Sequence, residues 1–183
     1  MEYNNYFWKE GEEGGIMDKN KIITAALLEM GFPFSDADSK EAVDRKAASF
    51  LFERAVMQLL KDDCFTFNIE EVDPVLTDRR IFNGKFEYVK PDGYLCSLSP
   101  YVEERGNKLY TMKNNFHLKY KKKMDIKDIP DEYERYVTLA LAIMTAPTVG
   151  KAKSLERIYT LFNTERQSLL PLASYHINME DLS

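Results

Sequence analysis

The sequence has few of the residues that build covalent or metal-bound frameworks. Its 183 residues include only two cysteines, Cys64 and Cys96, which form neither a CxxC pair nor a cluster with histidine. Folding is therefore expected without a disulfide or a metal, and two separated thiols favour a reducing compartment. Apolar residues make up 44% of the chain and charged residues 30%, which is typical of a globular protein and too apolar for disorder.

Long apolar runs and export signals are also missing. The longest uncharged apolar stretch, residues 137–146, falls short of the ~20 residues of a membrane-spanning helix, so we expect a buried helix there. Residues 1–15 carry glutamates and aromatics where a signal peptide has a basic start and an apolar run. We expect a soluble protein made in the cytoplasm, without a membrane partner.

Motifs for common catalytic and cofactor sites are incomplete. Gly150-Lys151 looks like the end of a phosphate-binding loop, but the required glycine and hydroxyl positions hold Thr145 and Ala152. No spacing of cysteine, histidine and carboxylates is typical of a metal site. We therefore expect no cofactor, no metal site and no enzymatic activity.

The two histidines, His117 and His176, adjoin no recognisable catalytic triad. His117 is expected on the solvent face of a strand. A dyad of Cys64 or Cys96 with His117 stays open as a less favoured alternative, because free cysteines are usually buried small apolar residues.

Hydrophobic periodicity predicts two helices in the first third of the chain. Apolar residues recur at three- and four-residue steps over residues 21–31, which end at Gly31, and again over residues 39–62. Asp38 and Glu41 form a capping box at the start of the second helix. The apolar face predicted for this helix comprises Val43, Ala47, Phe50, Leu51, Ala55 and Leu59.

Two further helices are predicted towards the C-terminus. Residues 131–146 follow a proline and open with acidic residues, which suit a first helical turn, and Pro147 ends the pattern. Residues 151–170 form the last helix, which Pro171 is expected to stop.

Residues 64–121 are predicted to be extended. The segment 64–69 is rich in aromatic and β-branched residues, and residues 91–93 and 105–107 have the composition of tight turns. Near the end of the region, Phe116, Leu118 and Tyr120 alternate with His117, Lys119 and Lys121. One strand face is therefore expected to be apolar and the other wet. The predicted fold class is α+β, mainly an α-helical bundle with an inserted small antiparallel β-sheet.

Charge argues against a protein that wraps nucleic acid. The net charge is −5, from 25 basic and 30 acidic residues, whereas such a protein must neutralise many phosphates. One basic cluster remains, formed by Lys119, Lys121, Lys122 and Lys123. A solvated strand face is the favoured interpretation. The alternative is a DNA-facing strand, in which case the chain would be a nucleic-acid-binding regulatory protein.

A series of segments in a fixed order is more informative than any single residue. A helix ends in Gly-x-Pro, an alanine-rich helix follows, and an aromatic segment comes next. The segments are residues 25–33, 42–55, 63–71, 86–94, 103–111, 116–120 and 129–136. Over residues 22–172 this order resembles the tail tubular protein A family, the head-tail adaptors of short-tailed phages. Cys64 stands where that family often has tryptophan.

The resemblance implies a structural virion protein rather than an enzyme. Residues 21–172 would form the adaptor domain, between an N-terminal arm (1–20) and a C-terminal tail (173–183). A twelve-copy ring would join the capsid portal protein to the tail nozzle or next tail protein. The ring would continue the DNA ejection channel, through which DNA passes without sequence-specific binding. The helical part and the C-terminal segment are expected to engage the portal, and the sheet region to face the tail.

The two ends of the chain are the predicted partner-binding segments. The tail is expected to be disordered in the free monomer and to dock on the portal, or alternatively to pack on its own domain. Its apolar residues are Tyr175, Ile177, Met179 and Leu182. In the arm, Phe7 and Trp8 are candidate aromatic anchors. A third interpretation, a hydrolase of the phage lytic set, would need a pocket with perturbed titratable groups.

Overall fold

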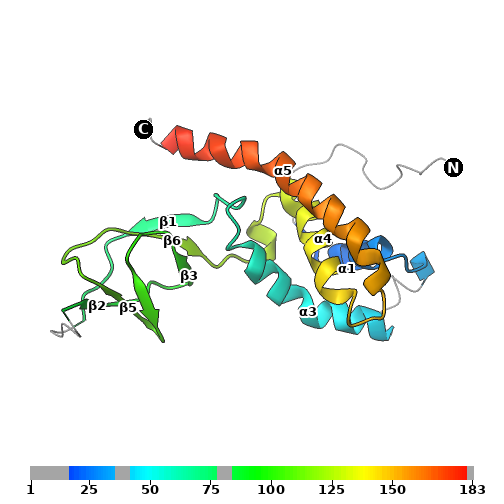
Figure 1. The fold of residues 1–183 in the computed structure, drawn as a ribbon, viewed down its shortest axis with the longest axis horizontal. Coiled ribbons are helices and arrows are strands. Elements are labelled where there is room, and N and C mark those ends of the chain that lie inside the picture. Colours follow the sequence, from blue (N-terminus) through cyan, green and yellow to red (C-terminus); the bar gives the residue numbers. More distant parts are fainter. Residues whose placement is uncertain (1–16, 36–41, 78–83, 181–183) are drawn as a thin grey trace.

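Two lobes make up the molecule, one helical and one built of strands (Figure 1). The computed structural model describes residues 17–35, 42–77 and 84–180, with side chains through residue 170. These residues form four α-helices and two three-stranded antiparallel sheets, which confirms the predicted α+β class. The helices are α1 (Lys19–Glu29), α3 (Val43–Leu59), α4 (Glu134–Thr145) and α5 (Leu155–Glu180).

The helical lobe is built around α4. Nine of the twelve residues of α4 are buried, and the helix contacts α1, α3 and α5. Two 3₁₀ turns, η1 (Ile126–Asp128) and η2 (Asp131–Tyr133), lead into α4, and η3 (Ala152–Ser154) precedes α5. The apolar run at residues 137–146 is thus confirmed as a buried helix.

Helix α1 ends where glycine predicts it. Gly31 has a φ of 82°, and the N–H groups of Gly31 and Phe32 donate to the carbonyls of Leu28 and Leu27 at 2.9 and 3.1 Å. This is the hydrogen-bond pattern of a left-handed glycine cap. At the other end, the Asp18 carboxylate accepts from the backbone N–H of Asn20 at 2.7 Å.

Helix α3 is rotated relative to the predicted apolar face. Val43 and Phe50 are 79% and 84% exposed, whereas Phe52 is buried and Arg45, expected on the charged face, is 6% exposed. The Arg45 guanidinium donates to Thr24 Oγ1 at 2.7 Å. Ala55 and Leu59 are buried as predicted, but the prediction was wrong for Val43 and Phe50. Apolar residues occupy positions 50, 51 and 52 in succession, so periodicity alone does not fix the buried face. The predicted capping residues 38 and 41 lie outside the described residues.

The β lobe contains two sheets and its own hydrophobic core. The strand orders are β1–β6–β3 and β2–β5–β4. The strands are β1 (Ile69–Val72), β2 (Phe86–Val89), β3 (Tyr94–Ser97), β4 (Glu103–Arg105), β5 (Lys108–Thr111) and β6 (Leu118–Lys122). Tyr88, Leu109, Phe116, Leu118 and Tyr120 form the core. Positive φ angles at Gly93 (73°) and Gly106 (56°) confirm the two predicted turns.

The aromatic segment before β1 is a turn, so the prediction of extended chain from Cys64 was wrong. β1 begins only at Ile69. Phe65 is fully buried in the helical core, with its ring centroid 4.6 Å from that of Tyr133 and 5.2 Å from that of Phe67. The alternation of aromatic and polar residues is typical of a strand. It equally suits a turn that places the rings of Phe65 and Phe67 against Tyr133 of η2.

Helix α5 continues through Pro171 to Glu180, so the predicted end near residue 170 and the non-helical tail were wrong. An interior proline removes one backbone donor and costs roughly 3 kcal/mol. The leucines and alanine around Pro171 favour helix and offset this cost. With 26 residues, α5 spans about 39 Å, and its C-terminal half extends beyond α4 (Figure 1).

Replacing Phe65 with alanine is expected to lower the free energy of unfolding by about 3–5 kcal/mol, because the whole ring is buried. Urea denaturation measures the change. Phe50→Ala is the matched control, since it removes the same atoms from a side chain that is 84% exposed, and it should change the free energy by less than about 0.5 kcal/mol. Equal losses in the two variants would contradict this placement of Phe65.

Candidate functional site: the junction between the lobes

The lobes meet at Lys121, near the end of β6. Its side chain is 1% exposed, and its ammonium donates to the backbone carbonyls of Asp62 and Phe65, the latter at 2.5 Å. Burial lowers the pKa of Lys121 from its ordinary value. The prediction that Lys121 lies on the wet face of its strand was therefore wrong, and the DNA-facing alternative does not apply to this buried lysine. Both sides of β6 are covered here, because Tyr120 enters the β core and Lys121 enters the turn after α3.

Asp62 connects this junction to α5. Its carboxylate accepts from the backbone N–H of Cys64 at 3.0 Å and lies 3.3 Å from Nη2 of Arg166. Burial acts to raise the pKa of Asp62, but the hydrogen bonds from Cys64 and Arg166 outweigh it and lower the pKa. The Tyr133 hydroxyl donates to the Cys64 carbonyl at 3.1 Å. The turn after α3 is thus bonded to β6, to η2 and to α5.

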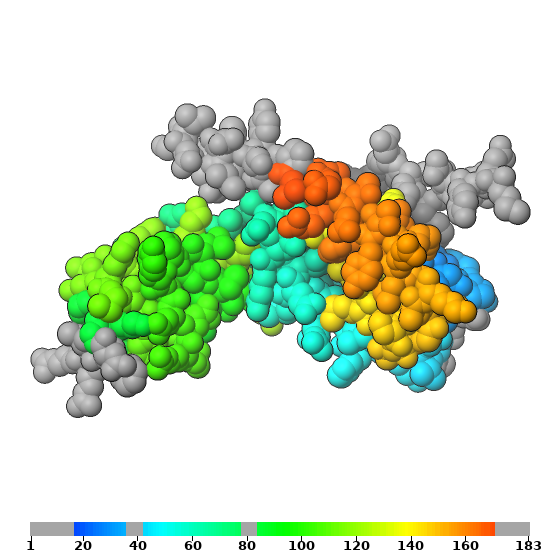
Figure 2. All heavy atoms as spheres, viewed as in Figure 1, coloured from blue at the N-terminus to red at the C-terminus, as the bar shows by residue number. Residues whose placement is uncertain are grey.

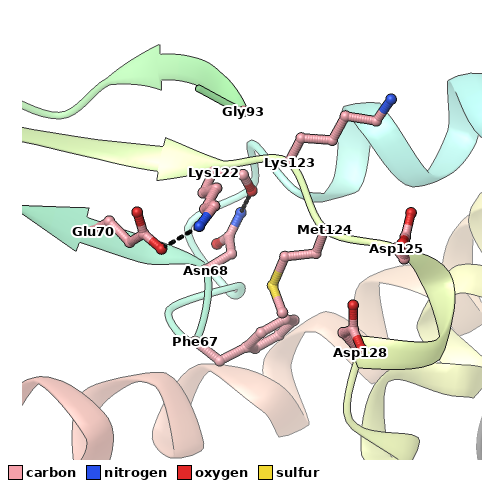
Figure 3. Close-up of a pocket in the computed structure, with 9 residues that line it drawn as sticks. All are labelled: Phe67, Asn68, Glu70, Gly93, Lys122, Lys123, Met124, Asp125 and Asp128. Carbon is pink, nitrogen blue, oxygen red and sulfur yellow. Dashed lines mark hydrogen bonds and ion pairs between the residues drawn. The ribbon is translucent and has the colours of Figure 1, made fainter. Parts of the chain in front are cut away.

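A pocket of about 380 Å³ opens beside this junction (Figure 3). Its walls come from the turn before β1, from β1 and β6, from the β2–β3 turn and from the segment leading into α4. The lining residues are Phe67, Asn68, Glu70, Gly93, Lys122, Lys123, Met124, Asp125 and Asp128. Glu70 accepts from Lys122 Nζ at 2.7 Å, and this hydrogen bond lowers the pKa of Glu70.

Sequence patterns do not identify Asn68, Asp125 and Asp128 as residues of a common pocket. Asn68 is one polar residue in an aromatic segment, and Asp125 and Asp128 are two acids in a short charged connection. Both signals are common in surface turns. Only the fold brings the three residues together, because Asn68 precedes β1 and the two aspartates follow β6, its antiparallel neighbour.

The remaining lysines of the basic cluster are largely neutralised by β1. Lys119 Nζ lies 2.9 Å from Glu71, and Lys122 Nζ lies 2.7 Å from Glu70. The antiparallel register of β1 and β6 sets Glu71 directly opposite Lys119. Lys123 is exposed at the edge of the pocket. The lysines therefore do not form the continuous free basic face that the DNA-facing interpretation requires.

His117 is exposed, as predicted, and both of its ring nitrogens have carboxylate partners. Nδ1 lies 2.9 Å from Asp73, and Nε2 lies 3.0 Å from Glu71. Both hydrogen bonds raise the pKa of His117, and the bond to Asp73 has the larger effect. Neither ring nitrogen is left for a dyad with Cys64 or Cys96. Burial raises the pKa of the Cys64 thiol to about 11, which disfavours the thiolate.

The predicted partner-binding residues cannot be placed in a contact. Phe7, Trp8 and Leu182 lie outside the described residues, and only the helical backbone is described for Tyr175, Ile177 and Met179. Within residues 17–35, 42–77 and 84–180, no group of three or more His, Cys, Asp or Glu side chains is arranged to hold a metal ion. None of the helices in this described part is both long and apolar enough to cross a membrane.

Replacing Lys121 with methionine is expected to lower the free energy of unfolding by about 1–3 kcal/mol, because the buried Phe65 carbonyl loses a charged donor. Chemical denaturation measures the loss. Lys123→Met removes the same charge at an exposed position and should change stability by less than about 0.5 kcal/mol. A Lys121→Met protein as stable as the parent would show that the ammonium contributes nothing net to the junction.

The imidazole of His117 is expected to titrate above its ordinary pKa of 6.5, and Asp73→Asn should move the pKa back towards that value. NMR titration of the ring C–H signals measures both pKa values. Because the folded pKa is raised, the stabilising contribution is present below pH 6.5 and is lost as the pH rises through the folded pKa. Asp92→Asn removes a charge elsewhere in the β lobe and serves as control. A parent pKa at or below 6.5 would contradict the arrangement.

Two comparisons of the sequence with known proteins identify no relative. No protein-family model matches the chain, and a search of curated proteins finds no match. The family to which this chain belongs is therefore not assigned by these comparisons, and a functional proposal depends on its residues and their geometry.

Proposed function

We propose that the chain is a head-tail adaptor of a tailed phage, a ring-forming virion protein that joins the capsid portal to the tail. The observation that carries the proposal is the two-ended shape of the protomer. The helical lobe and the β lobe lie at opposite ends of the molecule, and each has its own hydrophobic core (Figures 1 and 2). An adaptor must bind two different partners at once, and two separately stabilised lobes suit that task.

The order of elements supports the same proposal. Two helices, a region of strands and two further helices follow one another in the described residues, in the order of the motifs that resemble tail tubular protein A. The helical lobe also carries the extension of α5 beyond α4 (Figure 1). We assign the helical lobe and α5 to the portal side and the β lobe to the side of the nozzle or next tail protein.

Charge supports a channel through which DNA slides. The net charge is −5, and two lysines of β6 are paired with glutamates of β1. A channel wall with few free cations holds phosphates weakly. The alternative, a nucleic-acid-binding regulator, would need the basic strand to be free, whereas Lys121 is buried and Lys119 and Lys122 are ion-paired.

Mass measurement with and without the portal protein of the same phage tests the proposal. Twelve copies are expected to assemble on the portal ring, whether the free protein is monomeric or not. A protein that does not bind the portal would contradict the proposed function. Salt-sensitive affinity of the isolated protein for DNA, without portal binding, would favour the regulator instead.

Two variants test separately the proposed portal-binding end and the proposed tail-binding end of the molecule. A chain that stops at residue 172 should bind the portal more weakly and should still bind the next tail protein. Tyr101→Asp should do the reverse, because Tyr101 is 86% exposed in the β lobe. Its φ of 62° is one that aspartate tolerates, so the fold should be retained. Unchanged portal affinity after truncation would exclude the C-terminal segment as the docking element.

A further inference from the structure

Helix α3 has a second apolar stripe, on the side that faces away from the helical core. Val43, Phe50 and Met57 follow one another at seven-residue intervals, and Val43 and Phe50 are the strongly exposed members. The opposite side of α3, which includes Phe52 and Leu59, is buried. Seven residues are close to two helical turns, so the three side chains lie on one line along the surface. This is the pattern by which one helix packs on another.

Helix α5 has an exposed face without charge. Between residues 158 and 170 the exposed side chains are Tyr159, Thr160, Asn163, Thr164, Gln167 and Ser168. The hydroxyls of Thr160 and Thr164 donate to the carbonyls of Glu156 and Thr160, both at 3.0 Å. Because these donors have partners within the helix, apolar side chains can cover them without leaving a buried donor unpaired. Depletion of charge is typical of the centre of a protein interface.

The two faces belong to different sides of the helical lobe. Helix α4 packs against both α3 and α5 and lies between them (Figure 1). Ile158 and Leu169 are the buried residues of α5, and both belong to the same core as Phe52 of α3. The stripe of α3 therefore does not reach the uncharged face of its own α5. A contact between the two faces joins two copies of the chain head to tail.

Charges at one end of each face select the direction of this contact. The order is acid then base on both helices, Glu53-Arg54 on α3 and Glu156-Arg157 on α5, and all four side chains are exposed. In an antiparallel pairing that sets Phe50 opposite Thr160, each glutamate meets the arginine of the other helix. In a parallel pairing, like charges would meet. Within the described part of the chain, only Arg157 of these four residues has an ion pair.

We propose that the outward stripe of α3 binds the uncharged face of α5 in a second copy of this chain. Phe50 packs on the threonines of the neighbouring helix, and the two glutamate–arginine pairs fix the antiparallel register. Because the two faces differ, the contact repeats from copy to copy and closes into a ring when the rotation allows. The inference rests on the proposed function, which requires a ring, and it names the surfaces on which neighbouring copies meet.

Cysteine cross-linking of the full chain tests the contact. Phe50→Cys and Thr160→Cys, carried by separate chains and mixed, are expected to form a disulfide-linked dimer on oxidation, above the background of the parent chain. A chain with both substitutions should form a ladder of larger species. Lys113→Cys, at an exposed position in the β lobe, replaces Phe50→Cys in the control. Equal dimer formation by Phe50→Cys alone, or by the control mixture, would overturn the proposal.

Charge reversal tests the antiparallel register. Arg54→Glu should weaken self-association about fivefold, because it sets two acids against each other, and sedimentation measures the change. Adding Glu156→Arg to the same chain restores opposite charges and should recover the association. A double variant as weak as the single variant would overturn the register.

Cross-linking of concentrated free protein and of portal-bound protein separates this contact from the adaptor function. Portal binding without a ladder in either sample would overturn the contact and leave the adaptor function standing. A ladder from free protein that does not bind the portal would support the contact and contradict the adaptor function. Neither a ladder nor portal binding would overturn both.

Discussion

The hydrogen bonds from the Lys121 ammonium to the carbonyls of Asp62 and Phe65 are the constraint on which the arrangement of the lobes depends. Each lobe has its own core, so hydrophobic burial alone would leave their relative position loosely defined. A buried ammonium must keep its acceptors, because losing them would leave an unsatisfied charge in the interior. The turn after α3 is consequently held against β6, and Asp62 extends the same network to Arg166 of α5.

This junction also explains why the pocket lies where it does. Asn68 follows the turn that Lys121 holds, and its amide donates to the backbone of Leu60 and Lys122 on either side. The segment after Lys122 then leaves the sheet and leads towards α4, carrying Asp125 and Asp128 past Asn68. The pocket therefore forms where two neighbouring segments, the one before β1 and the one after β6, connect the two lobes. Its shape depends on the same hydrogen bonds that position the lobes.

A two-lobed molecule with a fixed joint is suited to the proposed role of a protein that contacts two neighbours. The proposed adaptor function uses the two ends of the molecule. Charge distribution is consistent with this view, since the three lysines of β6 are used within the protein, Lys121 in a buried contact and Lys119 and Lys122 in ion pairs with β1.

Local patterns in the sequence determined the presence and order of the helices, the turns and the fold class, because these depend on neighbouring residues, but they did not locate the end of α5. Gly31 ends α1 through its positive φ, and the uncharged run at 137–146 forms the buried helix α4. The tertiary structure alone decided the rotation of α3, the place of Phe65 in the helical core and the burial of Lys121. The pocket residues Asn68, Asp125 and Asp128 could not be predicted either, since none has a distinctive local pattern. In each case the deciding partner is distant in sequence, and local periodicity carries no information about which distant surface covers a residue.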